Sequence, residues 1–219
     1  MADVIGQRIA GNLVYIDKAA HLRRIIDAIG PDVIKYVDDF VAGPGTDTTV
    51  DSFWTVTRTE AGAGESTVAK GDGAGGVLVL TTDANEDDGI NMQLLGESFK
   101  LAAGTVLYFG IRLKLSEATQ SDFFAGLAIT DTDILGGVTD RIGFQKLDGV
   151  TAVTCMLEKD STETLSGTVL TQDADAYHTL EFYLDASGAV EFFVDGVSVA
   201  TPAVTNLPND EELRVALQF

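Results

Sequence analysis

The segment Leu180–Thr201, LEFYLDASGAVEFFVDGVSVAT, limits the possible folds of this chain more than any other stretch. Large apolar residues occupy every second position of 180–184, the period of a strand with one buried face. The same period returns over 190–194, and the turn-forming residues of 185–188 separate the two runs. Asp195-Gly196 then predicts a second tight turn and a further strand. The segment therefore predicts consecutive antiparallel strands.

Most of the chain after residue 32 follows the same design of short strands and turns rich in glycine and aspartate. Many short strands at similar spacing predict an all-β, antiparallel β-sandwich. At 219 residues the chain is long enough for one such domain and an extension. The predicted strands are 33–40, 53–59, 66–70, 76–82, 90–95, 105–115, 122–130, 140–146, 151–158, 164–170, 177–185, 189–195, 197–201 and 212–219.

The first 32 residues differ from the rest. A short strand is possible at 12–16, and one helix is predicted over 17–29, with Asp17 as its N-cap and Gly30-Pro31 ending it. The helix has an apolar stripe but is too short to be stable alone, so it must pack on the sandwich or on another chain. We therefore divide the chain into an N-terminal arm with one helix, 1–32, and a sandwich domain, 33–219.

Charge is unevenly spread along the chain. Residues 1–45 hold five Lys/Arg and six Asp/Glu, a net charge of −1, so the remainder carries −19 of the total of −20. An acidic body repels phosphate groups, which argues against nucleic acid and against anionic membrane surfaces as partners. High net charge also keeps β proteins from associating through their sheet edges.

The single cysteine, Cys155, cannot form an internal disulfide, which favours synthesis in a reducing compartment such as a host cytoplasm. It lies in an apolar run without a basic neighbour, so a small core residue is the expected role. The N-terminal sequence lacks the basic and apolar regions of a secretory signal. No stretch reaches the roughly 18 apolar residues that a membrane span needs.

Five segments occur in an informative order. They are YVDDF at 36–40, which Trp54 follows, GGVLVLTT at 75–82, FGIRLKL at 109–115, SDFFAGLAITDTD at 121–133 and DRIGFQK at 140–146. In this order they resemble strands of concanavalin A-like (laminin-G-like) jelly-roll sandwiches. The last two are similar to a strand pair of tailed-bacteriophage virion proteins with this fold. The family that the chain resembles, over about residues 33–219, is the phage capsid decoration (cement) proteins.

This resemblance implies a non-enzymatic structural role on the outer surface of an icosahedral capsid. The implied partners are the major capsid protein and sister subunits in a homo-oligomer, a trimer first and a dimer second. The nearly neutral N-terminal arm is the natural contact segment, although the helix could instead cap its own sandwich. The candidate contact residues are Leu13, Tyr15, Leu22, Arg23, Arg24, Ile25, Ile26 and Ile29.

The glycosidases of this fold need two carboxylates on one strand, two or four residues apart, so that both point into one cleft. Glu158-Lys-Asp160 has a suitable spacing but lacks a third carboxylate and falls at a strand end. Glu181 and Asp185 are four apart, with Tyr183 between them on the same face. We therefore expect no catalytic residues and no enzymatic activity.

Metal and cofactor sites have weak support. Asp83, Asn85 and Asp87 place oxygen ligands at alternate positions, as a calcium loop would, but the stretch departs from the EF-hand pattern. The two histidines, His21 and His178, have no cysteine or histidine cluster around them that could bind zinc. We expect no cofactor, and the calcium loop stays a weak candidate.

The alternative function is a carbohydrate-binding, lectin-like module, for example in a phage receptor-binding or tail-associated protein. Sugar sites on this fold need exposed aromatic side chains or a calcium-bound Asp/Asn pair. Trp54 is expected to pack in the core or at a sheet edge. Tyr177 and Phe124 are the exposed candidates.

Overall fold

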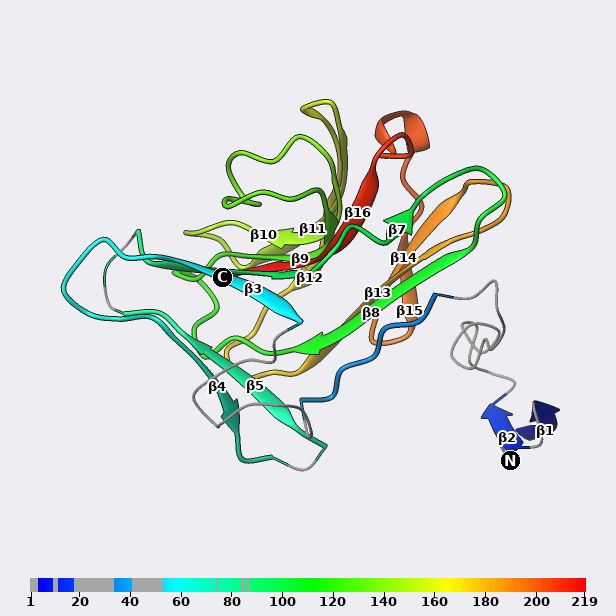
Figure 1. Cartoon of the computed structure of the whole chain (residues 1–219), viewed down its shortest axis with the longest axis horizontal. Coiled ribbons are helices and arrows are strands. Elements are labelled where there is room, and N and C mark those ends of the chain that lie inside the picture. Colours follow the sequence, from blue (N-terminus) through cyan, green and yellow to red (C-terminus); the bar gives the residue numbers. More distant parts are fainter. Residues whose placement is uncertain are drawn as a thin grey trace.

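Two antiparallel sheets packed face to face form the body of the protein, as the computed structural model shows (Figure 1). The structure describes residues 4–9, 12–17, 34–40, 53–73, 75–83, 85 and 87–219. Phe144 of the large sheet meets Phe192 of the small sheet edge-on, with ring centroids 5.2 Å apart. This contact across the layers identifies the described body as a sandwich.

The large sheet has the strand order β12-β11-β10-β9-β16-β6-β3, and the short strand β7 pairs with β16. Its strands are β3 (Trp54–Thr59), β6 (Gly89–Leu94), β7 (Phe99–Lys100), β9 (Phe123–Ala128), β10 (Arg141–Lys146), β11 (Ala152–Lys159), β12 (Thr162–Thr171) and β16 (Glu212–Gln218).

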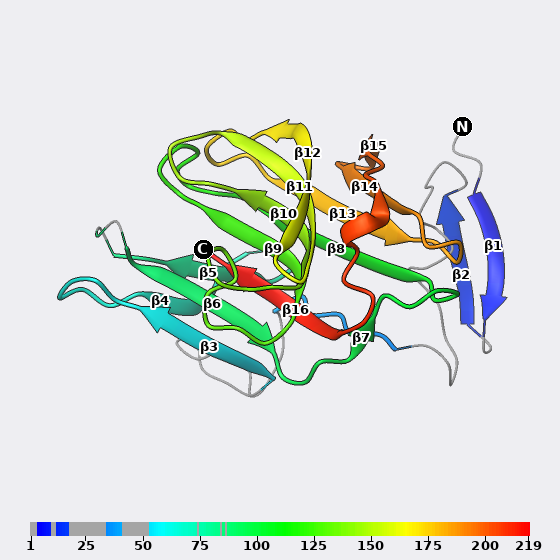
Figure 2. The same cartoon turned by 90° about the horizontal axis from the view of Figure 1, so that it is seen from above.

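The small sheet has the order β15-β14-β13-β8, which Figure 2 shows from above. Its strands are β8 (Leu107–Leu113), β13 (His178–Leu184), β14 (Val190–Val194) and β15 (Val197–Ala200), and a 3-10 turn, η1 (Val204–Asn206), follows. Two further hairpins are described, β4 (Thr67–Gly71) with β5 (Val77–Thr81), and β1 (Val4–Ile9) with β2 (Asn12–Asp17).

Alternation along the strands builds the core. On β13 the inward residues Leu180, Phe182 and Leu184 are all fully buried, and they face the inward residues of β9 and β10 within one apolar cluster. Three phenylalanines join the layers, since Phe182 stacks on Phe109 at 5.1 Å and lies 5.5 Å from Phe192. The β13–β14 hairpin that the sequence predicts is confirmed.

Every predicted strand from 53–59 onward is confirmed, with ends shifted by a few residues. The strand predicted at 33–40 is wrong, because 34–40 forms no strand. There the Asp38 carboxylate accepts the backbone N–H of Phe40 at 2.8 Å, and Phe40 has a φ of 55°. A side chain that bonds its own backbone in this way competes with a strand ladder.

The N-terminal prediction is corrected in part. The strand at 12–16 exists as β2, but its partner β1 was not predicted. Asp17, the predicted N-cap, is the last residue of β2 and pairs with Val4. The rest of the predicted helix, 18–29, lies outside the described residues. The described part of the chain holds no helix with the length and hydrophobicity needed to cross a bilayer.

Candidate functional site

The connection between β9 and β10, residues 129–140, covers the middle of the outer face of the large sheet. Ile134 of this connection is fully buried, and Val138 is 5% exposed. They form a second small apolar cluster with outward residues of the sheet, among them Phe124 and Met156. In the described structure this face is therefore a second packed layer, and it is not an open cleft.

Amide side chains of the sheet fasten the 129–140 connection in place. Asn91 Nδ2 donates to the carbonyl of Asp131 at 2.9 Å, and Gln93 Nε2 donates to the carbonyl of Ile129 at 2.9 Å. From β16, Gln218 Oε1 accepts the backbone N–H of Ile134 at 2.5 Å. These bonds satisfy backbone groups that burial would otherwise leave unpaired.

A buried ion pair lies under the same connection. Arg141 Nε is 2.6 Å from Glu158 Oε2, and the two side chains are only 5% and 7% exposed. Another guanidinium nitrogen donates to the carbonyl of Ile134, and a third reaches Glu163 at 3.3 Å. Glu158 is thus held by an arginine and buried. Its sequence neighbour Asp160 is exposed in a turn with a φ of 49°, so the two carboxylates do not face one cleft.

The outer face of the small sheet is different, since aromatic and charged side chains there reach solvent. One face of the small sheet is formed by the positions that alternate with core residues. On β8 these are 108, 110 and 112, and along β13 and the residue before it they are 177, 179, 181 and 183. We call this surface the tyrosine face and define it by Tyr108, Arg112, Tyr177, Glu181 and Tyr183. On its β14 side, Phe193 is 3% exposed.

Tyr108 lies at one end of the tyrosine face. The hydroxyl end of its ring lies over Gly110, where a Cβ would sit 2.9 Å from Tyr108 Cζ. The hydroxyl donates to Glu181 Oε1 at 2.7 Å, and Tyr108 is directly opposite Tyr183 in the strand register. Burial, and then this hydrogen bond, raises the pKa of Tyr108 above its usual range, so the hydroxyl stays a donor. The absence of a side chain at Gly110 leaves room for the hydroxyl end of this ring.

The other end of the tyrosine face carries positive charge. The Arg112 guanidinium stacks on the Tyr177 ring with its carbon 3.9 Å from the ring centroid. Lys114 Nζ is 5.5 Å from the same centroid and 3.0 Å from a carboxylate oxygen of Asp175. The face is therefore polar along its length, with a carboxylate near one end and a guanidinium near the other.

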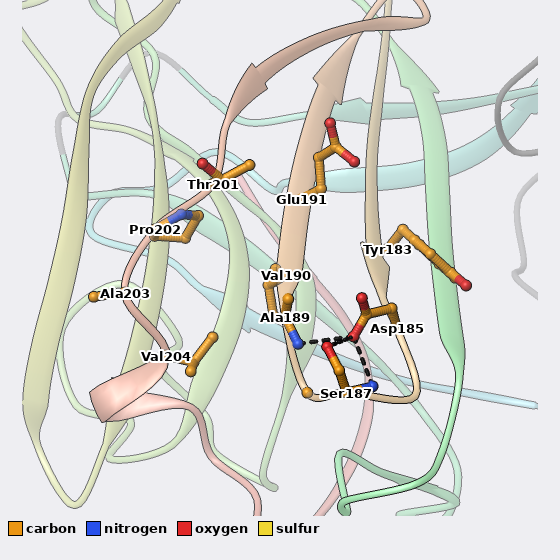
Figure 3. A pocket seen from close by; sticks show the side chains of 11 residues that line it. Tyr183, Asp185, Ser187, Ala189, Val190, Glu191, Thr201, Pro202, Ala203 and Val204 are labelled. Carbon is orange, nitrogen blue, oxygen red and sulfur yellow. Dashed lines mark hydrogen bonds between the residues drawn. The ribbon is translucent and has the colours of Figure 1, made fainter.

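A hollow of about 440 Å³ lies beside Tyr183, between the β13–β14 turn and residues 201–204 (Figure 3). Tyr183 is directed away from the 201–204 segment. The turn is held by Asp185, which accepts the Ser187 hydroxyl at 2.6 Å and the Ala189 N–H at 3.0 Å. These bonds, the one from Ser187 first, keep the pKa of Asp185 below its usual range. Glu191, also on the rim, accepts the Ser198 hydroxyl at 2.5 Å.

The structure separates the aromatic candidates of the sequence. Tyr177 is 41% exposed, as expected, but Phe124 is fully buried under the 129–140 connection, so its expected exposure is wrong. Trp54 is 8% exposed and packs against Tyr36 with centroids 6.0 Å apart, which confirms a packing role. Sequence reasoning missed Tyr108 and Arg112, although their alternation with core residues of β8 was available.

The remaining candidates are placed as follows. Asn85 Nδ2 donates to Asp83 at 3.3 Å, and no group of three metal-binding side chains forms within the described ranges. Cys155 is buried, and burial raises its pKa to about 12. Leu13 and Tyr15 lie on β2. The other contact candidates, Leu22, Arg23, Arg24, Ile25, Ile26 and Ile29, lie outside the described residues.

No protein-family model matches the sequence, and no curated protein does. Solved structures do match. An endo-1,3-beta-glucanase from Streptomyces sioyaensis aligns over 87% of this chain and 86% of its own, with a TM-score of 0.54 and 15% identity. A glycoside hydrolase family 16 endo-glucanase from Bacteroides ovatus aligns over 83% and 84%, with a TM-score of 0.57 and 17% identity. The globular domain of T. cruzi calreticulin aligns over 77% of both chains, with a TM-score of 0.54 and 14% identity.

These likenesses correct one expectation. The prediction that the protein is not an enzyme is contradicted, because two of these similar structures are glucanases. None of the three is described as a phage or capsid protein. At such identities the likeness shows the fold alone. The chain is an all-β, antiparallel sandwich of the concanavalin A-like jelly-roll type.

Proposed function

We propose that the protein is a carbohydrate-binding module whose ligand lies on the tyrosine face. The observation that carries the proposal is the Tyr108 ring, whose hydroxyl end lies over Gly110 and whose hydroxyl donates to Glu181. A flat aromatic ring offers an apolar surface for the C–H face of a sugar, and a carboxylate beside it accepts sugar hydroxyls. Tyr183, opposite Tyr108, extends the aromatic surface to the next strand.

The similar structures suggest which sugars to try first. Two of them act on glucans according to their names, an endo-1,3-beta-glucanase and an endo-glucanase. We therefore choose β-1,3-linked and mixed-linkage gluco-oligosaccharides as probes. The large-sheet face is packed under residues 129–140, which leaves the tyrosine face as the aromatic surface of the described sandwich that is open to such a ligand.

Titration calorimetry with the full chain tests the proposal. Tyr108→Ala should abolish measurable binding, because it removes the stacking surface and leaves Glu181 without its donor. Tyr108→Phe should keep part of the affinity, since the ring remains. Phe53→Ala is the matched control, because Phe53 is an aromatic residue that is 56% exposed away from this face. Binding that Tyr108→Ala leaves unchanged would contradict the proposal.

The same incubations should be analysed for shortened oligosaccharides, because the fold includes glucanases. Glu181 on the tyrosine face and Glu191 on the adjoining rim are diagonal neighbours on β13 and β14. Side chains in that relation have Cβ atoms about 7–8 Å apart. Shortened products that disappear in Glu181→Gln would extend the proposal from binding to hydrolysis.

A role on a phage particle is the second candidate. One observation favours it. Residues 129–140, which pack on the outer face of the large sheet, connect β9 and β10, and these are the two strands that resemble phage virion proteins. A closed, acidic exterior suits a subunit repeated many times over a shell, with the major capsid protein and sister subunits as partners. Quantitative mass spectrometry of purified particles tests it. A copy number near that of the shell protein is expected, and absence from particles would refute it.

A further inference from the structure

We infer that the ligand of the tyrosine face is an extended oligosaccharide carrying an anionic substituent, a carboxylate or a sulfate, which Arg112 binds at the Tyr177 end. The inference rests on the proposed function and goes further, because it states the ligand's length, its charge and its direction on the surface.

The length follows from the spacing of the aromatic residues. Tyr177 immediately precedes β13, and Tyr183 lies six positions later, which is an even spacing that places both on the same face. An extended chain rises about 3.4 Å per residue, so they are separated by roughly 20 Å. A ligand that touches both must be a chain of several sugars lying along β13.

The charge follows from Arg112. Its side chain is exposed, stacks on Tyr177 at 3.9 Å, and has no ion pair with any described residue. The neighbouring Lys114 is paired with Asp175 at 3.0 Å, so Arg112 is the cation left available at this end. Stacking restricts the guanidinium plane, and no hydrogen bond to a described residue occupies its N–H groups. A planar fork of this kind matches a carboxylate or a sulfate in two parallel hydrogen bonds.

The direction in which the oligosaccharide lies follows from the charge at the Tyr108 end of the tyrosine face. Near Tyr108 the charged group is Glu181, which repels an anion and accepts hydroxyl donors. An acidic sugar therefore belongs at Tyr177, and neutral sugars belong at Tyr108 and Tyr183. The net charge of −20 does not prevent this, since charges further than about 8 Å away are largely screened at physiological salt.

The test compares three gluco-oligosaccharides of equal length on the full chain: one neutral, one with a terminal uronate and one with a terminal sulfate. We expect the anionic forms to bind more tightly, and Arg112→Gln to remove about tenfold or more of that advantage. Arg112→Gln should weaken binding of the neutral chain much less than binding of the anionic chains, because only the anionic chains form the paired hydrogen bonds. Arg112→Lys should restore only part of the advantage, because an ammonium cannot form the paired bonds. Arg58→Gln, an exposed arginine of β3, is the charge-matched control.

The outcomes separate the two proposals. If neutral and anionic chains bind equally, or if Arg112→Gln and Arg58→Gln weaken anion binding alike, the inference is overturned while the proposed function stands. If none of the three oligosaccharides binds, both proposals are overturned. A preference for uronate over sulfate, or the reverse, identifies which anionic sugar is the ligand.

Discussion

Replacing Glu158 by alanine is expected to lower the free energy of unfolding by about 3–5 kcal/mol. The variant leaves the Arg141 guanidinium buried, 5% exposed, without the carboxylate that now lies 2.6 Å away. Glu163 is 3.3 Å from another guanidinium nitrogen but is 42% exposed, and so it compensates little. The same arginine binds the carbonyl of Ile134, so the 129–140 connection should loosen as well.

Urea unfolding followed by circular dichroism measures this effect. The matched control is Glu212→Ala, which removes an ion pair with Lys100 of similar length, 2.8 Å, but with a carboxylate that is 54% exposed. Exposed pairs contribute about 0–1 kcal/mol, so the control should hardly change stability. If both variants lost the same free energy of unfolding, the Arg141–Glu158 pair would not be buried as described.

Replacing Phe182 by alanine is expected to cost about 3–5 kcal/mol, the second large effect. Phe182 is fully buried and contacts aromatic rings on both sides, Phe109 at 5.1 Å and Phe192 at 5.5 Å. Phe192 in turn meets Phe144 of the large sheet, so the cavity would lie where the two layers join. Neighbouring strands fix these rings, and the space cannot close completely.

The same unfolding experiment applies, with Phe53→Ala as the control because Phe53 is 56% exposed. The control should change stability by less than about 0.5 kcal/mol, as is usual for surface positions. A loss below about 1 kcal/mol for Phe182→Ala would contradict the placement of this ring at the centre of the sandwich. The tyrosine face provides a second readout, since sugar binding should weaken as the small sheet loosens.

The strands could be predicted because their signal is local. Burial of one face leaves an alternating pattern, and 180–184 shows it without any knowledge of the partner strand. The strand at 33–40 failed for an equally local reason, because the Asp38 carboxylate bonds the backbone of Phe40. Asp17 is typical of a helix N-cap, yet its pairing with Val4 across a hairpin places it in a strand.

The candidate site depends on contacts that lie far apart in sequence. Asn91 and Gln218 alternate with core residues as solvent-facing residues do, but residues 129–140 fold over them. Alternation identifies the outward face without saying whether water or another segment covers it. The tyrosine face also depends on residues that are distant in sequence, because the register of β8 against β13 brings Tyr108 opposite Tyr183, 75 positions later in the chain.

Carbohydrate binding at the tyrosine face is most directly tested by an NMR titration of the isotope-labelled full chain with a mixed-linkage gluco-oligosaccharide. The account predicts that the amide resonances of Tyr108, Gly110, Glu181 and Tyr183 shift together in a saturable way, and that those of 129–140 stay in place. Shifts confined to 129–140 and the large sheet, or no shifts at the highest soluble concentration, would contradict it.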